Sequence, residues 1–172
     1  MTVTHSYHAS LVWSGSTGAG YRVYDRTHRV AMPPAVAELE LSADPSFGGE
    51  DRQPNPEQLL LAAASSCQLL SFLALAARAG IDVVHYEDDA EAIMPSARDG
   101  MRITAIVLRP QIVVADGTGI DDVRDLVHTA HESCYIAHSL TADVTVDPFI
   151  EPAREQSTHR LSGADSGTEQ AP

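Results

Sequence analysis

Residues 55–80, NPEQLLLAAASSCQLLSFLALAARAG, decide the fold of this chain. Asn55 is a favourable N-cap, a proline occupies the first helical position, and Gln58 completes a capping box with Asn55. Gly80 supplies the stop signal, so the stretch predicts one long helix over 56–79. Because this helix is apolar on nearly every face, we expect a sheet to bury one side and another helix or subunit the other.

Extended segments surround this helix, and a second helix follows later in the chain. Apolar and polar residues alternate in each predicted strand, and the first three strands form an antiparallel meander. The predicted strands cover 7–13, 21–32, 35–41, 82–94, 102–114 and 140–146. Apolar residues at three- and four-residue steps predict an amphipathic helix over 120–138. The order indicates an α+β fold of antiparallel sheets with two main helices, with Tyr7, Trp13 and Phe72 in its core.

The length and composition suit one folded domain. The chain has 172 residues, of which 44% are hydrophobic, and both values are typical of a single globular domain. We assign residues 1–150 to this domain and 151–172, which has a single leucine as its large apolar residue, to a disordered tail. No secretory signal pattern and no run of about 18 apolar residues is visible, so we expect a cytoplasmic protein that does not enter a membrane.

The charged residues exclude several classes of function. All 11 basic residues are arginine, and 24 acidic residues bring the formal net charge to −13. Without lysine there is no Schiff base, no pyridoxal phosphate anchor and no P-loop. An acidic surface repels the phosphate backbone, so we expect no nucleic-acid partner. We also predict no cofactor.

The two cysteines are the main candidates for chemistry. Cys67 lies in the first predicted helix and Cys134 in the second, each on an apolar stripe. One interpretation is therefore that both are small buried hydrophobic residues. Two details favour chemistry instead: polar residues flank Cys67 in an otherwise apolar helix, and His131 precedes Cys134 by one turn, where an imidazole lowers a thiol pKa or carries a proton.

Three short motifs occur in a fixed order along the chain. They are Asn55-Pro56-Glu57-Gln58-Leu59-Leu60, Ala63-Ala64-Ser65-Ser66-Cys67 and Ala130-His131-Glu132-Ser133-Cys134. Together they resemble the OsmC/Ohr family of thiol-dependent peroxidases, over roughly residues 5–148. Residues 24–28 and 86–88 have no counterpart in the best-known members, so the chain is most similar to the less-characterised OsmC-like branch.

This resemblance implies both an assembly and a reaction. Members fold as intertwined homodimers whose sheets contain strands of both chains and whose central helices meet at the interface. Cys67 would attack the O–O bond of an organic hydroperoxide and become a sulfenic acid, with which Cys134 forms a disulfide. A dithiol donor, lipoylated protein in the best-known members, would restore both thiols. Glu57 would belong to the active site and position an arginine beside the thiolate.

The helix geometry adds one hypothesis about Glu57. Ten residues separate Glu57 from Cys67, which places them about 15 Å apart and about 80° apart around a straight helix. The two side chains cannot touch in one chain. We therefore hypothesise that Glu57 serves the Cys67 of the other subunit across an antiparallel pair of central helices.

The sequence departs from the family pattern at two positions. The first hairpin and the strand before the NPEQ motif lack the family's arginine, and Tyr135 follows Cys134 where many members have proline. A thiolate without a fixed cation is less populated at neutral pH. The nearby candidates for a cation are Arg22, Arg26, Arg29, Arg52 and His28.

Two other functions are compatible with the sequence. The first is a non-catalytic or small-ligand-binding OsmC-like dimer, in which the cysteines are incidental. The second is a metal-dependent protein that uses the histidines and cysteine of the second helix and would purify with stoichiometric zinc. Four ligands on one helix cannot all converge on a tetrahedral ion, which disfavours the second function. These ligands would be His128, His131, Cys134 and His138.

Overall fold

The long helix has the bounds that the sequence predicts. In the computed structural model, which describes residues 3–96 and 100–153, α1 spans Pro56–Ala79. The Asn55 side chain accepts the backbone N–H of Gln58 at 2.8 Å, and the Gln58 side chain accepts that of Asn55 at 3.0 Å. Gly80 ends the helix with φ 72°, a left-handed conformation that glycine adopts without strain.

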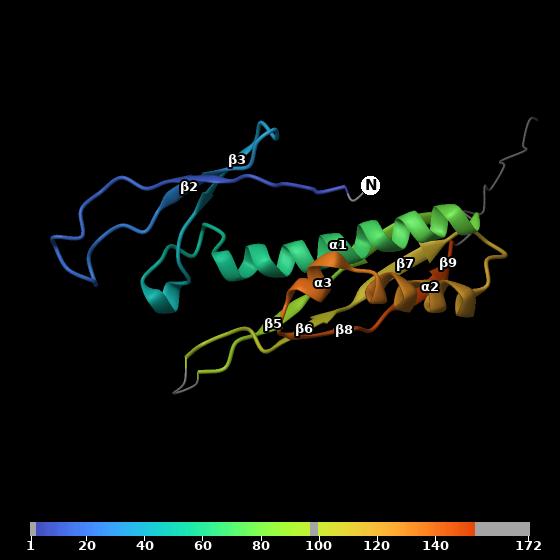
Figure 1. Ribbon diagram of the computed structural model, residues 1–172. Helices are drawn as coiled ribbons and strands as arrows, with labels where there is room; N and C mark the ends of the chain where they lie inside the picture. The colour runs from blue at the N-terminus through green and yellow to red at the C-terminus, as the bar shows by residue number, and fades with distance from the viewer. Residues whose placement is uncertain (1–2, 97–99, 154–172) are drawn as a thin grey trace, which may run out of the picture.

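The N-terminal meander is present, with shorter strands than predicted. β1 (Ser10–Val12), β2 (His28–Ala31) and β3 (Glu38–Leu41) form an antiparallel sheet in the order β1-β2-β3. A 3-10 turn, η1 (Pro45–Phe47), then leads into α1. The sheet lies at the N-terminal end of α1, away from α2 (Figure 1).

The two longer predicted strands are each divided into two. The first consists of β4 (Val83–Asp88) and β5 (Glu91–Ile93), and the second of β6 (Ala105–Leu108) and β7 (Pro110–Val114). β4 pairs with β7, and β5 with β6, in antiparallel register. Because both predicted strands are divided, their halves belong to two different three-stranded sheets, β4-β7-β9 and β5-β6-β8.

The antiparallel pairing that the sequence predicts is present in both sheets, and the third strand of each sheet adds a parallel pairing. β8 (Asp143–Val146) pairs in parallel with β6, and β9 (Phe149–Pro152) with β7. The intervening helices return the chain to the start of the sheet, as a crossover connection must. β9 was not predicted and ends two residues inside the segment assigned to the tail; residues 154–172 lie outside the described residues.

The predicted helix over 120–138 is two helices. α2 covers Ile120–Glu132 and α3 covers Tyr135–Ser139. Cys134 separates them with a non-helical ψ of 110°. α2 packs beside α1, and both cover the strands (Figure 1). Their contact face forms the main core, together with β7 and β9, from Phe72, Ala76, Ile112, Val114, Val123, Val127, Ala130 and Ile150.

Several apolar side chains are exposed in the single chain. Phe72 is fully buried as predicted, but Tyr7 is 91% exposed and Trp13 37% exposed, so their predicted place in the core is wrong. On the outer face of α1, Leu70 is 63% exposed. By length and composition α1 could cross a membrane, a property that it shares with core helices of soluble proteins. One face of α1 packs in the core, and the described residues do not cover the other face, where Leu70 and Leu73 are exposed.

Candidate functional site

The structure brings the two cysteines together. Cys67 lies in the middle of α1 and is half-buried, whereas Cys134 is 1% exposed at the start of α3. Both are free thiols, and the Cys134 side chain is hydrogen-bonded to Cys67. The sequence separates these residues by more than sixty positions, so the packing of α3 on α1 creates the pair.

The break between α2 and α3 explains how this pair forms. The N–H of Cys134 bonds to the carbonyl of His131 at 3.1 Å, which closes α2, and the Cys134 carbonyl accepts the N–H of His138 at 3.1 Å, which opens α3. The first N–H groups of any helix lack partners within it. Here those of Tyr135 and Ile136 bond to the sulfur of Cys67.

The two thiols are electrostatically different. Burial alone would raise the pKa of Cys67, but hydrogen bonds from the N–H of Ile136, the Cys134 thiol and other donors lower that pKa below its ordinary value. Burial raises the pKa of Cys134, and its contact with Cys67 raises it further. Cys67 is therefore the more acidic thiol of the pair and the better candidate for a nucleophile, whereas Cys134 stays protonated to higher pH.

Ser71 is a member of this site that the sequence analysis missed. It follows Cys67 by one helical turn on α1, and its hydroxyl bonds to the Cys67 sulfur and lowers the pKa of that thiol. Ser71 could have been identified from its position four residues after Cys67 on the predicted helix, where the two side chains are neighbours. The N–H donors of Tyr135 and Ile136 could not have been identified in this way, because the sequence did not predict the break between α2 and α3.

The polar residues beside Cys67 hold α1 in place. The Ser65 hydroxyl donates to the Asp88 carboxylate at 2.5 Å, which ties α1 to β4. Gln68 is completely buried and donates to the Val127 carbonyl at 3.0 Å, which ties α1 to α2. These residues fix the helix on both sides of Cys67, and neither is among the hydrogen-bond partners that shift its pKa.

Glu57 lies apart from the cysteines of its own chain. It occupies the first turn of α1, ten residues before Cys67 on the same continuous helix, which corresponds to about 15 Å. Glu57 instead lines a cleft of about 450 Å³ between the N-terminal sheet and the start of α1, which we call the aromatic cleft. Its walls contain Leu11, Trp13, Thr17, Tyr21, Tyr24, Arg26, His28, Ser42, Ala43, Asp44, Phe47, Pro56 and Glu57.

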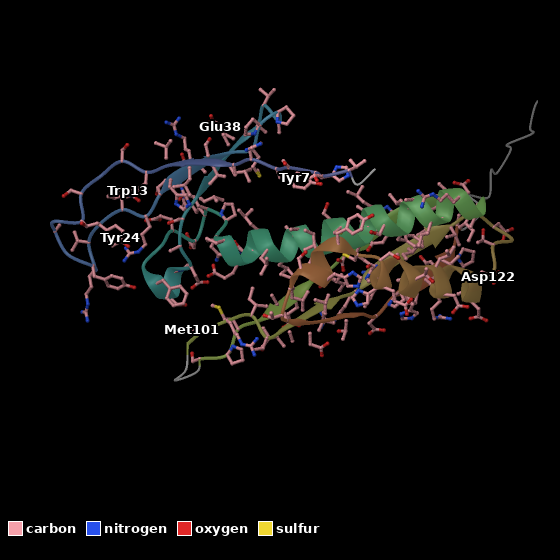
Figure 2. The ribbon with its side chains drawn as sticks, viewed as in Figure 1. Tyr7, Trp13, Tyr24, Glu38, Met101 and Asp122 are labelled. Atoms are coloured by element: carbon pink, nitrogen blue, oxygen red, sulfur yellow. The ribbon has the colours of Figure 1, made fainter. Side chains whose placement is uncertain are left out.

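Arg26 is built into the wall of the aromatic cleft. Its guanidinium donates to the carbonyls of Tyr24 at 2.9 Å, Tyr21 at 2.6 Å and Gly48 at 3.1 Å. The same group lies 4.0 Å from the centre of the Tyr24 ring, and Trp13 meets Tyr24 edge to face. Figure 2 shows Trp13 and Tyr24 at the same end of the molecule. Of the five N–H donors of arginine, these bonds leave two for another partner.

The other cation candidates are less suitable in the described part of the chain. Arg29 forms an exposed ion pair with Glu38 at 4.0 Å, and both Arg22 and Arg52 are exposed. His28 lines the cleft, where its Nδ1 pairs with the Arg26 carbonyl at 2.8 Å. Among the described residues no arginine contributes to the lowered pKa of Cys67, and the hydrogen-bond donors that lower it are all neutral.

The structure does not assemble the histidines of α2 and α3 into a metal site. His131 is half-buried, and its Nδ1 has no hydrogen-bond partner within residues 3–96 and 100–153. Over the same residues, no three His, Cys, Asp or Glu side chains gather closely enough to hold a metal ion. The helix break between His131 and His138 separates the ligands that the sequence pattern suggested.

Removing the Cys134 thiol should raise the pKa of Cys67, because the thiolate loses a donor. We expect Cys134→Ala to slow alkylation of Cys67 by iodoacetamide about tenfold at neutral pH, since a hydrogen bond to a charged group contributes about 1.5 kcal/mol or more. The rate should rise as pH climbs through the folded-state pKa, and this rise should move to higher pH in the variant. Cys134→Ser keeps a hydroxyl donor and is the matched control. Identical profiles for all three proteins would disprove the hydrogen bond.

Comparisons with known proteins identify the family. The model of the OsmC family, described as OsmC-like protein, matches residues 48–148. An OsmC-like protein of unknown function from Vibrio cholerae has a similar structure, with a TM-score of 0.77 at 27% identity, covering 85% of this chain and all of that one. An organic hydroperoxide resistance protein from Legionella pneumophila shares the fold, with a TM-score of 0.63 at 21% identity, over 87% of this chain and 98% of that chain.

A curated relative extends this match at the level of sequence. The uncharacterised protein YmaD of Bacillus subtilis is 25% identical over 107 residues, which cover 60% of this chain and 71% of YmaD. The family model spans more than half of the chain, and it includes α1, Cys67 and Cys134. The chain therefore belongs to the OsmC-like protein family.

Proposed function

We propose that this protein is a thiol-dependent peroxidase that reduces organic hydroperoxides. The observation that carries the proposal is the contact between two thiols whose pKa values are shifted in opposite directions: hydrogen bonds lower the pKa of Cys67 against the effect of burial, and burial raises that of Cys134. A structural neighbour is an organic hydroperoxide resistance protein, which agrees with this chemistry.

The proposed reaction uses each cysteine once. The Cys67 thiolate attacks the distal oxygen of ROOH, so that an S–O bond forms, the O–O bond breaks and RO⁻ leaves and takes a proton from water. The Cys134 thiol then attacks the Cys67 sulfenic acid, which forms a disulfide and releases water. An external dithiol reduces this disulfide by exchange and is itself oxidised to a disulfide. We propose lipoylated protein as this donor and the reducing cytoplasm as the setting.

We further propose that the working unit is a homodimer in which Glu57 and the aromatic cleft of one copy face Cys67 of the other. Three features support this arrangement: the exposed outer face of α1, the exposed aromatic side chains of the N-terminal sheet, and the distance along α1 that keeps Glu57 from its own Cys67. Arg26 lines the same cleft as Glu57 and has donors to spare. It is our candidate for the cation beside the partner's thiolate.

Counting free thiols tests the proposed function. Reduced protein treated with cumene hydroperoxide should lose both thiols of each chain, because the sulfenic acid at Cys67 is resolved by Cys134. The aromatic cleft also favours a second candidate, a small-ligand-binding protein with incidental cysteines. That function predicts an unchanged thiol count, together with a change in fluorescence of Trp13, the only tryptophan, when an apolar ligand binds.

A further inference from the structure

We propose that Tyr135 contacts the organic group of the hydroperoxide and makes the site selective for hydroperoxides that carry an aromatic group. The inference rests on the proposed peroxidase function and adds to it a residue that determines specificity. It starts from the sequence, in which a large aromatic residue directly follows Cys134.

The backbone of Tyr135 is fixed against the reactive sulfur. Its N–H bonds to Cys67 and is one of the groups that lower the pKa of that thiol. The Cα atom is one bond of about 1.5 Å beyond this nitrogen. The Tyr135 ring therefore starts from a point next to Cys67, while Cys134 lies below it in the protein at 1% exposure.

The ring itself has no structural role within the described residues. It is 81% exposed, and it takes part in none of the aromatic or cation–π pairs, in contrast to Trp13, Tyr21, Tyr24 and Tyr86. Other groups hold α3: Ile136 packs against a core cluster, and the Ser139 hydroxyl donates to the Tyr135 carbonyl at 2.7 Å. An exposed aromatic ring that is attached next to this thiol, and that forms no aromatic or cation–π pair with the described residues, is suited to contact a ligand.

The direction of the reaction places the organic group near this ring. The Cys67 thiolate approaches the distal oxygen in line with the O–O bond, so the departing RO⁻ extends outward from the buried pair. In the single chain the Tyr135 backbone borders the sulfur and the ring is exposed, so we place the ring at the edge of that outward path. Hydrogen peroxide has no organic group and cannot make this contact, whereas the ring of an aryl hydroperoxide can stack on tyrosine.

Kinetics with three peroxides test the role of Tyr135. We expect Tyr135→Ala to lower kcat/KM for cumene hydroperoxide about tenfold, the effect of losing one apolar contact in a specificity pocket. The kcat/KM for tert-butyl hydroperoxide should fall less, and the kcat/KM for hydrogen peroxide should stay within about twofold of the wild-type value. Tyr135→Phe should keep the wild-type preference. Phe149→Ala, which removes an exposed aromatic ring on β9 outside the site, is the matched control.

The outcomes separate this inference from the proposed function. An equal loss on all three peroxides, or no loss, would overturn the role of Tyr135 while leaving the peroxidase intact. A loss accompanied by dissociation of a dimer, measured by light scattering, would make Tyr135 an interface anchor in the partner's aromatic cleft and would also overturn it. A wild-type protein inert toward every hydroperoxide would overturn the proposed function, and this inference with it.

Discussion

Replacing Cys67 with serine is expected to abolish hydroperoxide reduction, down to the rate of the buffer with dithiol alone. Serine keeps the size and polarity of the side chain, but its hydroxyl does not ionise near neutral pH and cannot replace the thiolate as a nucleophile. The measurement is steady-state consumption of cumene hydroperoxide with a dithiol donor. Ser66→Ala, an exposed neighbour on the same helix, should leave the rate unchanged.

Cys134→Ser separates the two chemical steps in the same assay. Cys67 keeps a hydroxyl donor in this variant and should still react with one equivalent of hydroperoxide. The sulfenic acid then has no resolving thiol, so it accumulates and is trapped by dimedone. A Cys67→Ser protein that still turns over, or a Cys134→Ser protein that never forms a sulfenic acid, would contradict the assignment of nucleophile and resolving thiol.

A mixed dimer of Cys67→Ser and Glu57→Ala chains is expected to recover activity that neither parent has. If Glu57 serves the partner's Cys67, one site of the mixed dimer combines an intact cysteine pair with an intact Glu57. The second site holds both substitutions. The mixed dimer should therefore show about half the activity of the wild type, because a two-fold dimer has two equivalent sites.

Chains with two different affinity tags allow the mixed dimer to be purified away from both parents. The matched control combines both substitutions in one chain and pairs it with a wild-type chain. If Glu57 acts across the interface, one site of that dimer carries Cys67→Ser and the other carries Glu57→Ala. Its activity should therefore be no higher than that of the Glu57→Ala protein. A mixed dimer as inactive as its parents, with an active control, would show that Glu57 acts within its own chain.

Local signals allowed α1 to be predicted to the residue. The cap at Asn55, the proline at the first position and the stop at Gly80 act over a few neighbouring residues, so the sequence contains all of the required information. The first three strands and the positions of the two longer strands were also predictable, because alternation depends only on which side chains face the core.

Features that depend on distant parts of the chain were not predictable. The apolar repeat of α2 continues through Cys134, so periodicity did not reveal the break that presents the N–H groups of Tyr135 and Ile136 to Cys67. β9 is only four residues long and includes a proline, and its strand character depends on pairing with β7. Alternation indicated an apolar face containing Trp13, but it could not show whether the same chain covers that face.

The two thiols of the candidate site were predictable from the sequence, but the groups that shift their pKa values were not. Cys67 and Cys134 followed from the motifs, and the structure brings them together. From the sequence we expected a cation that stabilises the thiolate. The described residues of one chain supply hydrogen bonds from α3, Cys134 and Ser71 instead, and the best-placed arginine, Arg26, lies with Glu57 in the aromatic cleft.

The most direct test of the cysteine pair is mass spectrometry of the reduced protein after one equivalent of cumene hydroperoxide. We predict that each chain loses both thiol hydrogens and that digestion yields one linked peptide pair, containing Cys67 and Cys134. The cumyl alcohol formed should equal the amount of disulfide. A chain of unchanged mass, or one that gains oxygen at methionine while both thiols stay free, would contradict the account.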